Sequence, residues 1–229
     1  MHSLTQPVYR ATLLTIARIT ACSALLAATP CLGADHRDIL WNAVSTCIDT
    51  HAKDYCSRCA TPRVEVDCRT CRDTTQVWAE SAEFVVIRDR KQCDCPDGFV
   101  HGLAIPRSRV TGVEDPGRPD GIWRFAWESA VQRLNPDEVA LAVNPKRERS
   151  QDQLHVHIVR VRRESLPVDP RRVARVDSLD RVWYAAARMA AELEWKDYGV
   201  LVVKGAESGY QVIVDDASTE YKFTRPKCR

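Results

Sequence analysis

The sequence predicts an α+β domain built on a mostly antiparallel sheet. Short apolar or alternating segments, typical of strands, are interrupted by longer stretches whose apolar residues recur at the helical period. In chain order the pattern is strand, strand, helix, strand, strand, helix and a final hairpin. Strands that follow one another through turns pair antiparallel, and the helices between them pack on the sheet.

The expected strands are short and rich in valine and isoleucine. They cover residues 84–87, 99–105, 138–143 and 151–160, followed by a hairpin of 200–203 and 210–214. The expected helices cover residues 36–50, about 121–134 and 178 to about 195, while 51–76 and 164–177 are expected to be loop regions. Asp120 and Ser178 are the expected helix N-caps. Pro106 should end its strand, because it cannot donate a ladder hydrogen bond.

Residues 1–34 have the composition of a secretory signal. They contain no acid, carry Arg10 and Arg18 ahead of a short apolar run, and end in small residues before Asp35. The run is short for a spanning helix, which needs about 20 residues. An uncleaved membrane anchor stays open as the alternative. The folded domain is therefore expected at residues 35–229.

The charge balance argues against a nucleic-acid-binding protein. Residues 1–34 hold two of the 33 basic residues and none of the 31 acidic ones, so the remainder is neutral. A nucleic-acid-binding domain would instead show a basic excess. Nucleic acid is therefore not an expected partner.

Eight cysteines follow the leader, an even number that favours disulfides in an exported protein. They are Cys47, Cys56, Cys59, Cys68, Cys71, Cys93, Cys95 and Cys228. The pairs Cys56-x-x-Cys59 and Cys68-x-x-Cys71 also have the spacing of a four-thiolate zinc site. Disulfides are favoured over this structural zinc because the compartment should be oxidising. The pairing stays open, since eight cysteines allow 105 connectivities.

Gln153, His155 and His157 should project from one face of the expected strand 151–160. The apolar residues between them, Leu154, Val156 and Ile158, should face the core. Exposed imidazoles have a pKa of about 6.5. The two histidines are then partly neutral at pH 7 and can act as nucleophiles, bases or metal ligands.

A basic loop precedes this strand and should fold over its first histidine. Residues 144–152 read Asn-Pro-Lys-Arg-Glu-Arg-Ser-Gln-Asp and are rich in cations and hydrogen-bond donors. Guanidinium groups, a hydroxyl and an amide around an imidazole suit a phosphate ester.

These residues resemble the histidine triad superfamily. The run from Gln153 through His155 and His157 is similar to its three-histidine signature, with glutamine in the first place. The segment 101–106 is similar to its strand of a histidine, an apolar run and a proline, and Asp89 sits where it has a ribose-binding acid. The longer similarity, over roughly residues 36–165, is to the bacterial CDP-diacylglycerol pyrophosphatase family. The cysteine-rich insert, about 51–76, departs from that pattern, and the part from about 175 to 229 is a C-terminal extension.

The resemblance implies a histidine triad-like sheet and a two-step reaction without a catalytic metal or other cofactor. His155 would attack the α-phosphorus of a nucleotide, and water would hydrolyse the nucleotidyl-histidine. His157 and Gln153 would contact the non-bridging oxygens. The implied substrate-binding residues are Asp89 on the ribose, His101 beside the phosphates, and Asn144, Arg149, Ser150 and Gln151 around the phosphate or the leaving oxygen.

The expected function is hydrolysis of CDP-diacylglycerol to CMP and phosphatidate in phospholipid metabolism. The expected partners are this lipid-linked nucleotide and a membrane surface, at the periplasmic face of the inner membrane of a bacterial envelope. Two alternatives stay open. One is another nucleotide pyrophosphatase or nucleotidyltransferase of the same superfamily. The other is an exported cysteine-rich module whose histidines bind a metal.

Overall fold

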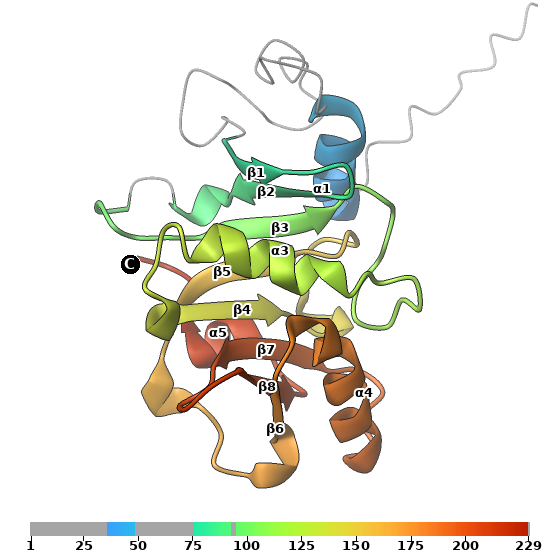
Figure 1. Cartoon of the computed structure of the whole chain (residues 1–229). Helices are drawn as coiled ribbons and strands as arrows, with labels where there is room; N and C mark the ends of the chain where they lie inside the picture. The colour runs from blue at the N-terminus through green and yellow to red at the C-terminus, as the bar shows by residue number, and fades with distance from the viewer. Residues whose placement is uncertain (1–35, 49–75, 93–94, 229) are drawn as a thin grey trace, which may run out of the picture. The chain divides into compact units, whose positions relative to one another are not determined.

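A mostly antiparallel sheet dominates the part of the chain that the computed structural model describes, residues 36–48, 76–92 and 95–228 (Figure 1). The strand order is β1-β2-β3-β5-β4-β7-β8-β6, and the short β9 pairs with β5. Strand β5 lies between β3 and β4, antiparallel to both. The predicted α+β class is confirmed, and the histidine strand is an interior strand of the sheet.

The strands are short, as their valine-rich runs indicate. In chain order they are β1 Val77–Glu80, β2 Phe84–Arg88, β3 Gly102–Pro106, β4 Val139–Val143, β5 Val156–Val161, β6 Val173–Val176, β7 Gly199–Lys204, β8 Tyr210–Asp215 and β9 Thr224–Arg225. β3 ends at Pro106, as predicted. β7 and β8 form the predicted C-terminal hairpin.

The helical elements cover only part of each predicted range. The N-terminal range is a succession of η1 His36–Asp38, α1 Ile39–Asn42 and the π-helical η2 Ala43–Cys47, and the longer helices are α3 Gly121–Ala130, α4 Val182–Glu192 and α5 Thr219–Phe223. Short 3-10 turns are η4 Arg90–Gln92, η5 Pro136–Glu138, η6 Lys146–Glu148, η7 Arg163–Ser165, η8 Pro170–Arg172 and η9 Leu179–Arg181. Among the described residues, no helix has the length and apolarity needed to cross a membrane.

One face of the sheet packs against α3 and α4. Val156 and Ile158 of β5 lie in one core cluster with Trp123 of α3 and Trp183 of α4. The rings of the two tryptophans meet edge to face with centroids 4.7 Å apart. Full burial of a side chain such as Ile158 contributes roughly 1.5–3 kcal/mol. The prediction that this side of the histidine strand faces the core is confirmed.

The opposite face carries two smaller apolar clusters. One joins β2 and β3 to Ala43, Val44 and Ile48, and the other joins β4, β5 and β7 to Phe223 of α5. His157 of β5 pairs with Leu103 of the first cluster and with Ala142 of the second. Alternation therefore places its imidazole on this face, at the junction of the two clusters.

Two local predictions are corrected by the structure. Strand β5 begins at Val156 rather than at residue 151, because Leu154 donates its N–H to the carbonyl of Val110 (2.6 Å) and Gln153 turns toward the same loop. Asp120 occupies the N-cap of α3, but its side chain caps nothing. Ser178, by contrast, accepts from the N–H of Asp180, as predicted for a cap.

The structure also contains elements that the sequence analysis did not predict. They are β1, the edge strand β6 inside the expected loop 164–177, the helix α5, and β9. Two of these, α5 and β9, lie next to the histidines and complete the site described below.

Candidate active site

His155 and His157 lie side by side, as the strand period predicts. Their ring centroids are 4.8 Å apart and the rings meet edge to face. Both side chains are buried, with His155 8% exposed. The prediction of exposed imidazoles with an ordinary pKa was therefore wrong, because the loops and α5 cover this face of the sheet.

A third imidazole, that of His101, contacts His157 from the end of the segment leading into β3. His101 Nε2 lies 3.1 Å from His157 Nδ1, and His101 Nδ1 lies 2.9 Å from the carbonyl oxygen of Pro226. A carbonyl can only accept, so His101 Nδ1 carries a proton. His101 is fully buried and both of its nitrogens have partners.

The backbone fixes the tautomer of His155. His155 Nδ1 lies 2.7 Å from the carbonyl oxygen of Gln153, so Nδ1 must donate. In the neutral ring, Nε2 then bears the lone pair. In this tautomer Nε2 is the nitrogen that could act as a nucleophile or a base.

Burial keeps the imidazoles neutral. It lowers the pKa of His155 and of His101, and the nearby carboxylates of Asp89 and Glu220 offset this only in part. The pKa of His157 lies well below its ordinary value, first through burial and then through His155, His101 and Lys91. Neutral imidazole is the form that attacks phosphorus.

Glu220 lies at the centre of the cluster and was not predicted. Its side chain is 2% exposed, and one carboxylate oxygen, Oε1, accepts from Lys91 Nζ at 2.5 Å. The other oxygen, Oε2, accepts from Asn144 Nδ2 at 3.0 Å and lies 3.3 Å from His157 Nε2. One sequence signal was available, because Ser218 can cap a short helix there and does accept from the N–H of Tyr221.

Asn144 and Asp89, two of the predicted substrate-binding residues, lie in the same cluster, and their role toward a substrate stays a prediction. Asn144 follows β4 directly, and its Oδ1 accepts from Ser218 Oγ (2.8 Å) and from the N–H of Glu220 (3.2 Å). Asp89 Oδ2 lies 3.3 Å from His101 Nε2, and Oδ1 accepts from the N–H of Lys91. Asn144 is therefore the link between β4 and α5.

The structure assigns the amide of Gln153 to the backbone rather than to a substrate. Gln153 is fully buried, and its Nε2 donates to the carbonyls of Pro106 (2.9 Å) and Ser108 (2.8 Å). Its Oε1 accepts from the N–H of Val110 at 3.4 Å. Because both amide protons are engaged, the role proposed for it on a phosphoryl oxygen is withdrawn.

The basic loop is also used within the fold. The guanidinium of Arg149 is buried, donates to both carboxylate oxygens of Glu114, at 2.8 and 2.6 Å, and lies 3.3 Å from Asp152. Gln151 accepts from the N–H of Leu40 and so anchors α1. Ser150 is exposed. Among the described contacts, none joins these loop residues to the histidines, and their substrate-binding roles stay predictions.

Only one group of described residues could hold a metal ion. Donor atoms of Asp89, His101 and His157 all lie within 4.8 Å of one another. The hydrogen bond between the two imidazoles already accounts for part of this proximity, and we assign no metal there. The alternative zinc site of Cys56, Cys59, Cys68 and Cys71 lies outside the described residues.

A disulfide joins Cys95 to Cys228, with the two Cα atoms 5.7 Å apart and a sequence separation of 133. The bond links the segment before His101 to the C-terminal tail. Pro226, whose carbonyl accepts from His101, lies two residues before Cys228. The expectation of disulfides is met for this pair.

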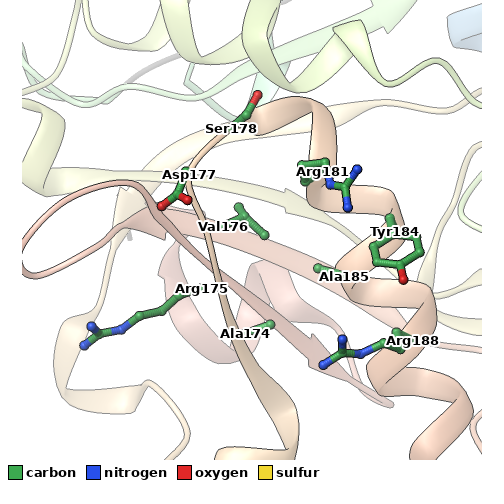
Figure 2. A pocket seen from close by; sticks show the side chains of 9 residues that line it. All are labelled: Ala174, Arg175, Val176, Asp177, Ser178, Arg181, Tyr184, Ala185 and Arg188. Atoms are coloured by element: carbon green, nitrogen blue, oxygen red, sulfur yellow. The ribbon is translucent and has the colours of Figure 1, made fainter.

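A hollow of about 300 Å³ lies elsewhere, between β6 and α4. Figure 2 shows Tyr184 and Arg188 along α4, Arg181 at the end of η9 just before it, and Ala174 and Val176 on β6. Ala174 and Val176 pack on the core cluster of the α3 and α4 face, opposite the face that carries His157. No histidine lines this hollow.

The comparisons with known proteins agree with the resemblance seen in the sequence. The chain is 42% identical over 67 residues to the CDP-diacylglycerol pyrophosphatase of Mycobacterium bovis (strain BCG / Pasteur 1173P2), covering 24% of this chain and 26% of the relative. The same values hold for the protein of that name from Mycobacterium tuberculosis (strain ATCC 25177 / H37Ra). A probable CDP-diacylglycerol pyrophosphatase of Mycobacterium leprae (strain TN) is 44% identical over 69 residues, covering 24% of this chain and 25% of the relative.

These alignments span about a quarter of the length of the curated relatives. The family model is the broader finding. The model described as CDP-diacylglycerol pyrophosphatase matches residues 35–213, which is most of the chain and includes all three histidines of the cluster. The chain therefore belongs to the CDP-diacylglycerol pyrophosphatase family.

Proposed function

We propose that this protein hydrolyses CDP-diacylglycerol to CMP and phosphatidate through a nucleotidyl-histidine intermediate on His155. The observation that carries the proposal is the 2.7 Å contact between His155 Nδ1 and the Gln153 carbonyl, which leaves the Nε2 lone pair for attack. Membership of the CDP-diacylglycerol pyrophosphatase family supports the choice of substrate.

In the first step, the Nε2 lone pair of His155 forms a bond to the phosphorus that carries the cytidine. The bond from this phosphorus to the bridging oxygen breaks, and the electron pair leaves on the oxygen of phosphatidate. In the second step, water attacks the same phosphorus, releases a proton, and returns the electron pair of the N–P bond to His155. Two moderate barriers then replace one high barrier.

The neighbouring groups have separate roles in this proposal. Asp89, with 12% of its side chain exposed, would accept from the ribose hydroxyls. The neutral ring of His157 would lie beside the phosphates with its Nδ1 donating to His101 Nε2. His101 was expected beside the phosphates, but both of its nitrogens are engaged, so we reassign it to the orientation of His157.

We further propose that the protein works in the bacterial cell envelope, at the periplasmic face of the inner membrane. The leader-like composition of residues 1–34 and the lipid-linked substrate of the family support this location. A fusion of the full chain to a reporter that is active only after export tests it. Activity confined to the cytoplasmic fraction would contradict the location without affecting the reaction.

The reaction is tested with purified protein and CDP-diacylglycerol in mixed micelles. His155→Ala should abolish turnover, and a quenched reaction of the wild type should give a CMP adduct on the peptide that contains His155. Full turnover by the variant would exclude the mechanism. Faster hydrolysis of a dinucleoside polyphosphate than of CDP-diacylglycerol would instead favour a general nucleotide pyrophosphatase. Zinc that is lost on mutation of His155 would favour a metal-binding module.

A further inference from the structure

The substrate of the proposed reaction brings at least two negative charges to the histidine cluster. The basic loop of residues 144–152 was expected to meet them, but its arginines are engaged by acids. Arg147 lies 3.6 Å from Asp197 and 3.7 Å from Asp216, and Arg149 pairs with Glu114. The two arginines of the loop are therefore already engaged, which directs attention to a cation closer to the histidines.

Lys91 is the cation that the fold brings to the histidines. It lies in η4, directly after β2, with its Nζ 2.5 Å from Glu220 Oε1 and 31% of its side chain exposed. Its positive charge lowers the pKa of all three imidazoles, those of His101, His155 and His157. Burial works to lower the pKa of Lys91, but the carboxylates of Glu220 and Asp89 outweigh it, so that the pKa is raised and the ammonium stays charged.

Without the charge of Lys91, the carboxylates of the cluster would repel an anionic substrate. Asp89 and Glu220 are acidic and the imidazoles are neutral, so an anionic phosphate would enter beside two carboxylates. An ammonium has three donors. The bond to Glu220 uses one of them, which leaves two that can meet phosphate oxygens.

Building on the function proposed above, we propose that Lys91 is a catalytic residue that binds the phosphate attacked by His155, and that Glu220 positions it. In the displacement, negative charge builds on the non-bridging oxygens while the N–P bond forms and the P–O bond breaks. Lys91 donates to these oxygens and transfers no proton. A charged donor aimed at developing charge is the most effective kind of transition-state stabilisation.

Glu220 can position Lys91 because it is itself held rigidly. Its carboxylate accepts from Asn144 and its backbone N–H donates to the same residue, while the Ser218 cap fixes the start of α5. A buried carboxylate is costly unless it is paired with a cation and hydrogen-bonded. The contacts of Glu220 with Lys91 and Asn144 meet this condition and fix the ammonium relative to His157.

The competing interpretation is that Lys91 only neutralises Glu220. The two are separated by Lys91→Met, Glu220→Gln and the double variant, assayed with CDP-diacylglycerol. Lys91→Met should lower kcat/KM by about 10²–10³-fold, and Glu220→Gln by about 10²-fold through misplacement. The double variant has a neutral pair of similar shape, which avoids an unpaired buried charge. It should stay as slow as Lys91→Met, and its return to within a few-fold of wild type would overturn the inference.

A second readout separates phosphate binding from support of the fold. Lys91→Met should weaken inhibition by CMP by roughly 10–100-fold, the value of one charged hydrogen bond, while inhibition by cytidine stays unchanged. Equal losses for both ligands would contradict a contact with phosphate. The matched control is Lys222→Met, because Lys222 also pairs with a buried acid, Asp215, at 2.8 Å. This control should keep its activity.

The experiment also distinguishes failure of this inference from failure of the proposed function. His155→Ala is assayed in the same series. If that variant retains full turnover, the histidine mechanism is excluded whatever Lys91 does. If it is inactive while the double variant of Lys91 and Glu220 works normally, only the role of Lys91 is wrong.

Discussion

The tautomer and the charge of the His155 imidazole determine whether this residue can act as a nucleophile. One nitrogen is fixed as a donor by the Gln153 carbonyl, and burial disfavours the cationic ring. Both effects keep the lone pair on Nε2. A surface histidine with its ordinary pKa would be partly protonated near neutral pH, and the protonated fraction would lack this lone pair.

The pH profile of kcat/KM should show this effect. Protonation removes the lone pair, so activity falls as the pH drops through the folded-state pKa of His155. Burial lowers that pKa, and turnover should therefore persist below pH 6.5, the ordinary midpoint of histidine. Because the positive charge of Lys91 lowers the pKa of His155 and the negative charge of Glu220 raises it, Lys91→Met should move the acid limb to higher pH and Glu220→Gln to lower pH. Shifts in the same direction for both variants would contradict this electrostatic account.

Gln153 is a residue of the motif whose side chain supports the fold, because it binds backbone groups of a neighbouring loop. Gln153→Ala removes two donors and an acceptor that hold the loop of residues 106–110 against the histidine segment. The free energy of unfolding should fall by roughly 1–3 kcal/mol for the unsatisfied buried groups, measured by urea denaturation. If the amide instead served the phosphate, the variant would keep its stability and lose only turnover. Ser150→Ala, at an exposed position of the neighbouring loop, is the control and should keep its stability.

At the scale of elements, strands and helices with a clear hydrophobic period could be predicted from the sequence, whereas elements of only a few residues could not. The alternation around His155 and His157 placed both rings on one side of the chain, and the stripes of α3 and α4 placed their tryptophans in the core. Helix α5 has five residues and β9 has two, which is too short for any period to appear in the sequence. Their conformation depends on tertiary contacts such as those of Asn144 with Ser218 and Glu220. Glu220 could not be recognised for that reason.

The basic loop of residues 144–152 shows that composition alone does not predict which groups the cations of an element contact. Its composition predicted phosphate binding, yet its arginines pair with acids from segments that the sequence does not place nearby. Lys91, whose ammonium contacts Glu220 beside the histidines, lies two residues after Asp89. The composition of the loop predicted that cations bind the phosphates. The tertiary contacts of the fold favour Lys91 for this role instead of the loop arginines.

At the scale of the whole molecule, the site is assembled from segments far apart in the sequence. Lys91 and Glu220 are 129 residues apart, and His101 and His157 are 56 apart. The central sheet brings them together because β5 pairs with β3 on one side and β4 on the other, while the tail adds β9 to β5. The C-terminal tail thus contributes Glu220 and the Pro226 carbonyl to the candidate active site.

The disulfide between Cys95 and Cys228 should therefore matter for both stability and activity. Closing a loop of 133 residues restricts the unfolded chain, and loss of such a bond typically costs about 2–5 kcal/mol. The free energy of unfolding of the double variant Cys95→Ser with Cys228→Ser, measured by urea denaturation, should be lower by that amount. It should also lose turnover under conditions where it is folded, because the Pro226 carbonyl that orients His101 lies beside the released end. Wild-type protein treated with a mild reductant provides the comparison without a substitution. Unchanged turnover in a destabilised variant would show that β9 alone holds the tail in place.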